Sequence, residues 1–238
     1  MCTPTPPPPA PPVRDRALPV LAAALTGATL LLTVLVATGW SPLHDLDRSL
    51  ADSLHRSAVA HPALTRANLI LSDWVWDPVT MRALAAVTVL ALWWRRERGL
   101  AIWFAVTTAL AAALQQGLKS LIGRERPQWP DPVDSAQFAA YPSGHAMTAT
   151  VTCGLLLWLL ARSPAGDRVW LTGLTVAAVS VIGVGVTRLY LGVHWLTDVV
   201  GGWLLGALVV AVAAWTYERR TASSEQRSPD SERLTDDR

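Results

Sequence analysis

Charged residues are scarce in most of this 238-residue chain, and cysteine and lysine are almost missing. Only 16% of the residues are charged. Eleven of these lie within residues 218–238, so the rest of the chain has about half the charge density of a soluble protein. An ordinary soluble domain is therefore excluded. The two cysteines, Cys2 and Cys153, indicate neither a disulfide framework nor a thiolate metal site.

Basic residues are not in large excess either. The formal net charge is +2, which excludes the strongly basic surface of a typical nucleic-acid-binding protein. The basic residues are 19 arginines and a single lysine, Lys119, a bias that identifies no function by itself. What the chain has in abundance is apolar sequence, because 51% of its residues are hydrophobic and its mean hydropathy is +0.31. These values are typical of membrane proteins.

Six long stretches with little or no charge account for this hydropathy. Most are long enough to cross a hydrocarbon core about 30 Å thick as a helix. One contains Arg82, whose side chain can extend to the headgroups, and another contains Asp198. The stretches are residues 17–39, 78–94, 99–118, 144–161, 169–187 and 195–217. We therefore predict an all-α, polytopic membrane bundle of about six transmembrane helices, with both termini on the same side.

The remaining segments divide the chain into one domain and two tails. Residues 1–16 begin with a proline-rich run and are predicted to be a disordered cytoplasmic tail. Residues 17–217 form the six-span domain, and the charged residues 218–238 are predicted to be a second disordered cytoplasmic tail. Within the outer loop 40–77, leucines recur at helical spacing among polar residues. That pattern predicts an amphipathic helix, which either lies on the membrane surface or covers the end of the bundle.

The positions of the basic residues indicate the orientation in the membrane. One set of helix ends carries Arg14, Arg16, Arg95, Arg96, Arg98, Arg162, Arg168, Arg219 and Arg220. The other carries Arg48, Arg56, Arg66, Lys119, Arg124, Arg126 and Arg188. If the last four of these serve a site, the outer loop keeps three arginines against five aspartates. The positive-inside rule then places both termini in the cytoplasm of a multi-pass plasma-membrane protein.

Three polar clusters fall at the predicted outer side, and the last contains His194 and Asp198. Residues four apart lie on one face of a helix, so the carboxylate can bind one imidazole nitrogen and leave the other as a free lone pair. This arrangement suits a nucleophile with its orienting group. A purely structural histidine–aspartate pair would have the same spacing, so the pair alone leaves both interpretations open.

The second cluster, residues 141–145, lies where a loop enters a long helix. Ser143 is a favoured N-cap, Gly144 permits close approach of a ligand, and a helix N-terminus attracts anions. A helix with a purely structural cap would have a similar sequence. His145 in the first turn adds a possible proton donor, which favours a catalytic role for this cluster. Single arginines at helix ends are often membrane anchors, whereas Lys119, Arg126 and Arg188 together suit the oxygens of a phosphate.

These residues together form an ordered pattern. It runs Lys119, six residues, Arg126-Pro127; then Pro142-Ser143-Gly144-His145; then Arg188, five residues, His194, three residues, Asp198. The pattern resembles the three-part signature of the type-2 phosphatidic acid phosphatase family of membrane lipid phosphatases, over about residues 99–217. Thr187 stands where the family usually has serine, and Glu125 where many members have proline.

The resemblance implies a role for each residue of the signature. Lys119, Arg126 and Arg188 would bind phosphate oxygens, assisted by Ser143 and the backbone of Gly144. His194 would be the nucleophile that forms a phosphohistidine, Asp198 its orienting group and His145 the general acid. The three cations would offset charge that many phosphoryl-transfer enzymes offset with Mg²⁺. We therefore expect neither a metal nor a cofactor.

The substrate implied by the resemblance is a lipid phosphate or pyrophosphate within the bilayer, hydrolysed at the extracytoplasmic face. Undecaprenyl pyrophosphate is the first candidate, and phosphatidylglycerophosphate, phosphatidate and diacylglycerol pyrophosphate are alternatives. Three other functions stay open: a lipid phosphotransferase, a non-catalytic lipid-phosphate binding or transport protein, and a vanadate site like that of the related haloperoxidases. The sequence predicts no oligomeric state.

Overall fold

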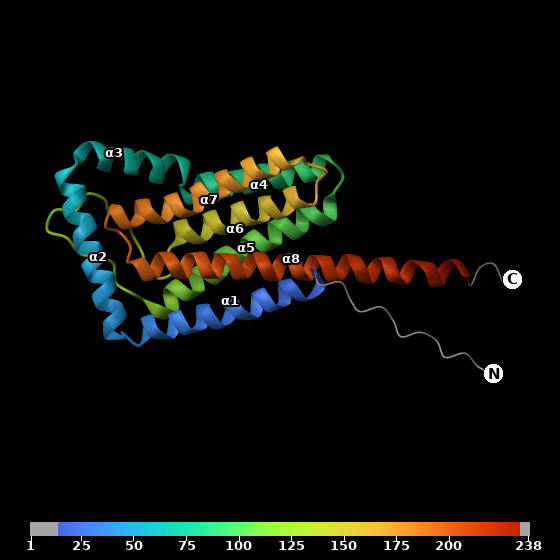
Figure 1. The fold of residues 1–238 in the computed structure, drawn as a ribbon, viewed down its shortest axis with the longest axis horizontal. Helices are drawn as coiled ribbons and strands as arrows, with labels where there is room; N and C mark the ends of the chain where they lie inside the picture. Colours follow the sequence, from blue (N-terminus) through green and yellow to red (C-terminus); the bar gives the residue numbers. More distant parts are fainter. Residues whose placement is uncertain (1–13, 234–238) are drawn as a thin grey trace.

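The computed structural model describes residues 14–233, with side chains for residues 17–223. Within this range the chain is a bundle of helices without β-strands (Figure 1). Its elements are α1 (Arg14–Ala37), α2 (Ser41–Ala60), α3 (Pro62–Ile70), the π-helical segment η1 (Leu71–Val75), α4 (Pro78–Trp94), α5 (Arg98–Ile122), α6 (Gly144–Ala161), α7 (Asp167–Tyr190) and α8 (Leu196–Arg233). Residues 1–13 and 234–238 lie outside the described residues; they belong to the two tails, 1–16 and 218–238, that were predicted to be disordered, and α1 begins at Arg14 within the first.

The membrane bundle predicted from the sequence is confirmed. Six helical stretches of the described chain are long and apolar enough to span a membrane. Large apolar side chains such as Leu31, Val87 and Leu110 are exposed on their outer surfaces, as expected where lipid chains are the neighbours. The first residues of α1 and the last turns of α8 lie at the same end of the bundle (Figure 1).

The second span is longer than predicted. The sequence placed residues 62–77 in an outer loop, but the candidate span runs over Pro62–Trp94. Pro62 occupies the first turn of α3, where its missing N–H costs nothing, and η1 continues the apolar helix almost to α4. The helix is interrupted at Trp76 and Asp77, and the carboxylate of Asp77 caps α4 by accepting the backbone N–H of Val79 at 2.5 Å.

Helix α2 crosses the end of the bundle away from the two termini (Figure 1). Its buried residues are Asp47, Ala51, His55 and Ala58. The leucine stripe is not the buried face, because Leu46 is 50% exposed. The face that carries Asp47 and His55 turns inward, where Asp47 pairs with the buried side chain of Arg124. The ring of His55 stacks on that of Trp129, with 4.0 Å between the ring centroids.

Helices α6 and α8 pack closely at the core of the bundle. Gly202 and Gly206 make this possible, because an added Cβ would lie 2.7 Å from the carbonyl oxygen of Ser143 or 2.8 Å from the Cβ of Thr150. Small residues at this spacing let two membrane helices approach backbone to backbone. The contact places the first turn of α8 against the first turn of α6.

Helix α8 extends beyond the predicted domain boundary. Disorder was predicted from Glu218 onwards, but the helix continues to Arg233 (Figure 1). Residues 218–228 include glutamate, arginine, alanine and glutamine, and no glycine or proline, so nothing in this stretch ends the helix. The charge that suggested a disordered tail is compatible with a helix that leaves the membrane.

Candidate active site

The predicted site residues meet at the end of the bundle that α2 covers. Helix α5 supplies Lys119 near its end and then stops at Gly123, which has a left-handed backbone with φ +60°. The loop that follows supplies Arg126, and the start of α6 supplies Ser143, Gly144 and His145. Helix α7 supplies Arg188 in its last turn, and the turn into α8 supplies His194 and Asp198.

His194 and Asp198 form the buried pair that their spacing predicted. The Nδ1 atom of His194 lies 3.3 Å from Oδ2 of Asp198, and the side chains are 1% and 0% exposed. The same carboxylate oxygen accepts the backbone N–H of Trp195 at 2.9 Å. The backbone carbonyl of Asp198 accepts the N–H of Ser143 at 2.9 Å, so the second and third clusters are joined directly.

The other nitrogen of His194 faces a cation. Nη1 of Arg126 lies 3.1 Å from Nε2 of His194, and because a guanidinium only donates, Nε2 must accept with its lone pair. The ring proton therefore resides on Nδ1, towards Asp198. Burial lowers the pKa of His194 well below its usual range, and the charges of Arg126 and Arg188 lower it further. The imidazole is thus neutral with its nucleophilic lone pair directed at Arg126.

All three predicted phosphate-binding cations lie within electrostatic range of His194, and Arg126 is the one that contacts Nε2. Arg126 also donates to the backbone carbonyls of Val193 at 2.5 Å and Phe138 at 2.9 Å, and Lys119 donates to the carbonyl of Ala139. Burial and the charge of Arg188 lower the pKa of Arg126 to about 10, so its guanidinium remains charged at neutral pH. Carbonyl oxygens are weaker partners for these cations than a phosphate would be.

Arg188 is almost fully buried, with 3% exposure. Its Nη1 donates to the hydroxyl of Ser72 at 2.8 Å and lies 3.3 Å from Oδ2 of Asp134. Asp73 is farther away, at 4.0 Å. Arg188 is therefore held at the site by residues of η1 and of the loop between α5 and α6, which the sequence motifs did not include.

The start of α6 completes the site. Among the residues that the structure describes, the buried hydroxyl of Ser143 has no hydrogen-bond partner. An added Cβ on Gly144 would lie 2.5 Å from Nε2 of Gln115, so the side chain of Gln115 would have to move to admit a larger residue. His145 is partly buried and lies within electrostatic range of His194, Arg188, Arg126 and Lys119. The imidazole of His145, the unpaired hydroxyl of Ser143 and the N-terminus of α6 are thus adjacent, and His145 lies within range of the cations.

Comparison with known proteins identifies the family. The family model of the PAP2 superfamily matches residues 100–222, which include all eight predicted site residues. The chain belongs to the PAP2 superfamily. Its fold agrees, because the crystal structure of a transmembrane PAP2-type phosphatidylglycerolphosphate phosphatase from Bacillus subtilis superposes with a TM-score of 0.74. That likeness covers 83% of this chain and 96% of the other, at 22% sequence identity.

Two curated relatives of this PAP2 protein are lipid phosphatases by name. An undecaprenyl-diphosphatase from Sulfolobus acidocaldarius is 32% identical over 146 residues, which are 58% of this chain and 61% of the relative. Phosphatidylglycerophosphatase B from Bacillus subtilis is 36% identical over 97 residues, which are 40% of this chain and 47% of the relative. The chain therefore matches between about half and three fifths of the length of these relatives.

Two buried side chains of this PAP2 protein near the site, those of Arg124 and Asp47, had no role assigned to them from the sequence. Arg124 binds Oδ1 of Asp198 through Nη1 at 2.6 Å and Oδ2 of Asp47 through Nη2 at 2.7 Å. Arg124 was grouped with the site cations when the orientation was predicted, and it lies within the first motif. Nothing in the sequence around Asp47 signals its position, because α2 is brought to the site only by the fold.

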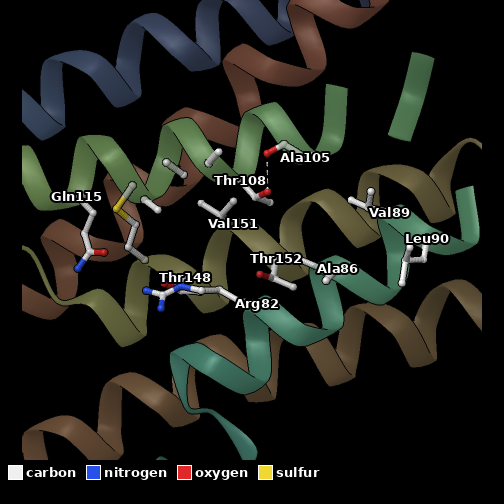
Figure 2. Close-up of a pocket in the computed structure, with 15 residues that line it drawn as sticks. Arg82, Ala86, Val89, Leu90, Ala105, Thr108, Gln115, Thr148, Val151 and Thr152 are labelled. Atoms are coloured by element: carbon white, nitrogen blue, oxygen red, sulfur yellow. Dashed lines mark hydrogen bonds between the residues drawn. The ribbon is translucent and has the colours of Figure 1, made fainter. Parts of the chain in front are cut away.

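A mainly apolar cavity of about 480 Å³ lies between α4, α5 and α6. Figure 2 shows Gln115, Arg82 and Thr148 at one end of this cavity, and Val89 and Leu90 at the other. The polar end is the one nearer the site, because Gln115 contacts Gly144 and Thr148 follows His145 by three residues. Arg82, the one basic residue of the predicted second span, thus lies beside this cavity.

Proposed function

We propose that this PAP2 protein is a lipid phosphatase that hydrolyses a lipid phosphate or pyrophosphate through a phosphohistidine on His194. One observation carries the proposal: Nε2 of His194 presents a lone pair to Arg126 at 3.1 Å while Nδ1 faces Asp198 at 3.3 Å. A nucleophilic nitrogen beside an anion-binding guanidinium, with an orienting carboxylate behind it, is the arrangement that phosphoryl transfer to histidine requires.

The proposed reaction has two steps. In the first, Nε2 of His194 attacks phosphorus, the bond between phosphorus and the leaving oxygen breaks, and His145 donates a proton to that oxygen. In the second, water attacks the phosphohistidine while His145 takes up its proton. The bond between phosphorus and nitrogen then breaks, and inorganic phosphate leaves. Asp198 holds the proton on Nδ1 of His194 and stabilises the positive charge that the ring acquires.

The cations would stabilise the charge on the transferred group. Lys119, Arg126 and Arg188 approach from three different segments, and the hydroxyl of Ser143 and the N-terminus of α6 add uncharged donors. Donors fixed in advance around a buried site stabilise a transition state strongly, because they need not reorganise during the reaction. We therefore propose that turnover needs no metal ion.

The substrate class follows from the position of the site. It lies at the ends of the membrane spans, where a lipid headgroup would be, and the neighbouring apolar cavity of about 480 Å³ suits part of a lipid chain. The relative named undecaprenyl-diphosphatase makes undecaprenyl pyrophosphate the first candidate, and the relative named phosphatidylglycerophosphatase B makes phosphatidylglycerophosphate the second. The distribution of arginines favours an extracytoplasmic site in the plasma membrane.

Phosphate release by the detergent-purified protein from a panel of lipid monophosphates and pyrophosphates tests the proposal. We expect the wild type to release inorganic phosphate, and His194→Ala to lose at least about a thousandfold in rate, or about 4 kcal/mol of barrier. His61→Ala is the matched control, because His61 is an exposed histidine between α2 and α3 outside the site. Binding of the lipids without turnover would contradict the proposal, and so would a new phosphoester with little free phosphate, which would indicate a phosphotransferase.

A further inference from the structure

The buried carboxylate of Asp198 is held from two sides. Its Oδ2 faces Nδ1 of His194 at 3.3 Å and accepts the N–H of Trp195 at 2.9 Å. Its Oδ1 accepts Nη1 of Arg124 at 2.6 Å, the shortest of these contacts. A carboxylate whose one oxygen is hydrogen-bonded to a guanidinium has little freedom to rotate. Arg124 therefore sets the direction in which Oδ2 of Asp198 points towards His194.

Arg124 is itself fixed by Asp47 from the crossing helix α2. Nη2 of Arg124 lies 2.7 Å from Oδ2 of Asp47, and the two side chains are 8% and 1% exposed. Asp47 also accepts the backbone N–H of Thr197 at 3.0 Å and its hydroxyl at 2.6 Å. Asp47 therefore satisfies one of the free N–H groups at the start of α8, the same helix turn that carries Asp198.

The charges in this cluster depend on Arg124. Two carboxylates, those of Asp47 and Asp198, are buried on either side of one guanidinium. Without that cation, two like charges would share a buried site, and protonation of one of them would be favoured. A protonated Asp198 would no longer attract the Nδ1 proton of His194 or stabilise the imidazolium formed during phosphoryl transfer.

Arg124 and Arg126 are only two residues apart but have different partners. The Nη atoms of Arg124 are bound to Asp47, Asp198 and the hydroxyl of Thr197. Arg126 instead donates to backbone carbonyls and to Nε2 of His194, the atom proposed to attack phosphorus. Arg124 therefore lies behind the nucleophile, on the side away from the substrate.

We infer that Arg124 and Asp47 form a positioning pair that orients Asp198, and through it His194, for attack. The inference rests on the proposed nucleophilic role of His194. It assigns to the crossing helix α2 a part in the reaction that its leucine pattern does not indicate. Neither residue contacts the phosphate-binding cations in the described structure, so the pair acts on the rate of the chemical step and not on substrate binding.

A double-mutant cycle on the full-length, detergent-purified protein tests this pair. The variants are Arg124→Gln, Asp47→Asn, Asp198→Asn, and Asp198→Asn combined with each of the other two, assayed for kcat and KM on the best lipid of the panel. We expect Arg124→Gln to lower kcat about a hundredfold and Asp47→Asn about tenfold, with KM within about threefold of wild type. In the Asp198→Asn background, each should change kcat by less than about threefold.

Two further variants keep the test decisive. Arg124→Lys retains the positive charge, but an ammonium group cannot bind Asp47 and Asp198 with the geometry of the two guanidinium nitrogens. We therefore expect this variant to fold and still lose about tenfold in kcat. Asp45→Asn is the matched control, because Asp45 is an exposed aspartate on the same helix as Asp47, and we expect wild-type kinetics. Full kcat in Arg124→Lys would overturn the inference even if Arg124→Gln does not fold.

The remaining outcomes separate this inference from the proposed function. Losses that multiply in the double variants would show that Arg124 and Asp47 act independently of Asp198 and would overturn the inference alone. A raised KM with unchanged kcat in Arg124→Gln would do the same, because it would make Arg124 a substrate-binding residue. A wild type that releases no phosphate from any lipid would overturn the proposed function first, and this inference with it.

Discussion

Nε2 of His194 lies 3.1 Å from Nη1 of Arg126, while Nδ1 of the same ring lies 3.3 Å from Oδ2 of Asp198. The two contacts fix the tautomer, because the guanidinium can only donate and the carboxylate attracts the remaining proton. The lone pair on Nε2, which we propose attacks phosphorus, is therefore present in the protein without substrate. This relationship connects the buried pair to the cations, and each prediction below depends on it or on the surroundings that maintain it.

The protonation state of His194 can be measured directly. Burial and nearby cations lower its pKa, so the neutral form persists to a lower pH than for a free histidine, whose pKa is about 6.5. We expect ¹⁵N NMR of the histidine-labelled protein to show a neutral ring protonated on Nδ1 at pH 6.5, with His194→Gln identifying the signal. Half-protonation at pH 6.5 or above, or a proton on Nε2, would contradict this account.

Substitution of Ser143 should lower the activity of the protein without changing its stability. Its buried hydroxyl has no partner among the described residues, so Ser143→Ala should leave the melting temperature nearly unchanged. A hydrogen bond to a charged phosphate contributes about 1.5–3 kcal/mol, so we expect kcat/KM to fall by about 10- to 100-fold. Ser120→Ala is the control, because the exposed hydroxyl of Ser120 binds only its own helix. Unchanged kcat/KM in Ser143→Ala would remove this residue from the site.

The cavity beside the site predicts a difference between lipid and soluble substrates. Ala112 lines it from α5, so Ala112→Trp should fill much of the space. We expect kcat/KM for the lipid to fall at least about tenfold, and kcat/KM for a small soluble phosphate ester to stay within about twofold. Ala113→Trp is the control, since Ala113 is exposed and does not line the cavity. Equal losses for both substrates would show that the cavity does not hold the lipid chain.

Removal of divalent metal ions tests the role assigned to the cations. Within the described part of the chain, no three side chains of histidine, cysteine, aspartate or glutamate are grouped to hold a metal ion. Four basic residues, Arg126, Arg188, Lys119 and Arg124, lie within electrostatic range of His194. We expect phosphate release to be unchanged after dialysis against EDTA and not to rise when Mg²⁺ is added back. A loss in EDTA that Mg²⁺ restores would show that the cations alone are insufficient.

The sequence predicted the membrane bundle and its family well, because both depend on local patterns. Six apolar stretches define the spans, and α6 begins and ends at the predicted residues, Gly144 and Ala161. The four-residue spacing of His194 and Asp198 likewise predicted their contact, although His194 lies in the turn before α8 and only Asp198 is on the helix. Such features are encoded within a few turns of the chain.

What the sequence could not predict depends on contacts between distant segments. Asp47 and Arg124 are 77 residues apart, and Arg188 and Ser72 are 116 residues apart. The leucine stripe of α2 predicted an amphipathic helix but gave no sign that Asp47 and His55 would be buried, with Asp47 paired to the buried side chain of Arg124. Hydropathy alone cannot anticipate this, because the free energy of an inward carboxylate depends on whether a buried guanidinium is there to meet it.

The most direct test of the central claim is to trap the phosphorylated enzyme. Brief incubation with a ³²P-labelled lipid phosphate, followed by an alkaline quench that preserves phosphohistidine, should leave label on the wild type. Digestion and mass spectrometry should place the phosphate on His194, and His194→Gln should carry none. Label on any other residue, or turnover by the wild type and His194→Gln at equal rates, would contradict the proposal that His194 is the nucleophile.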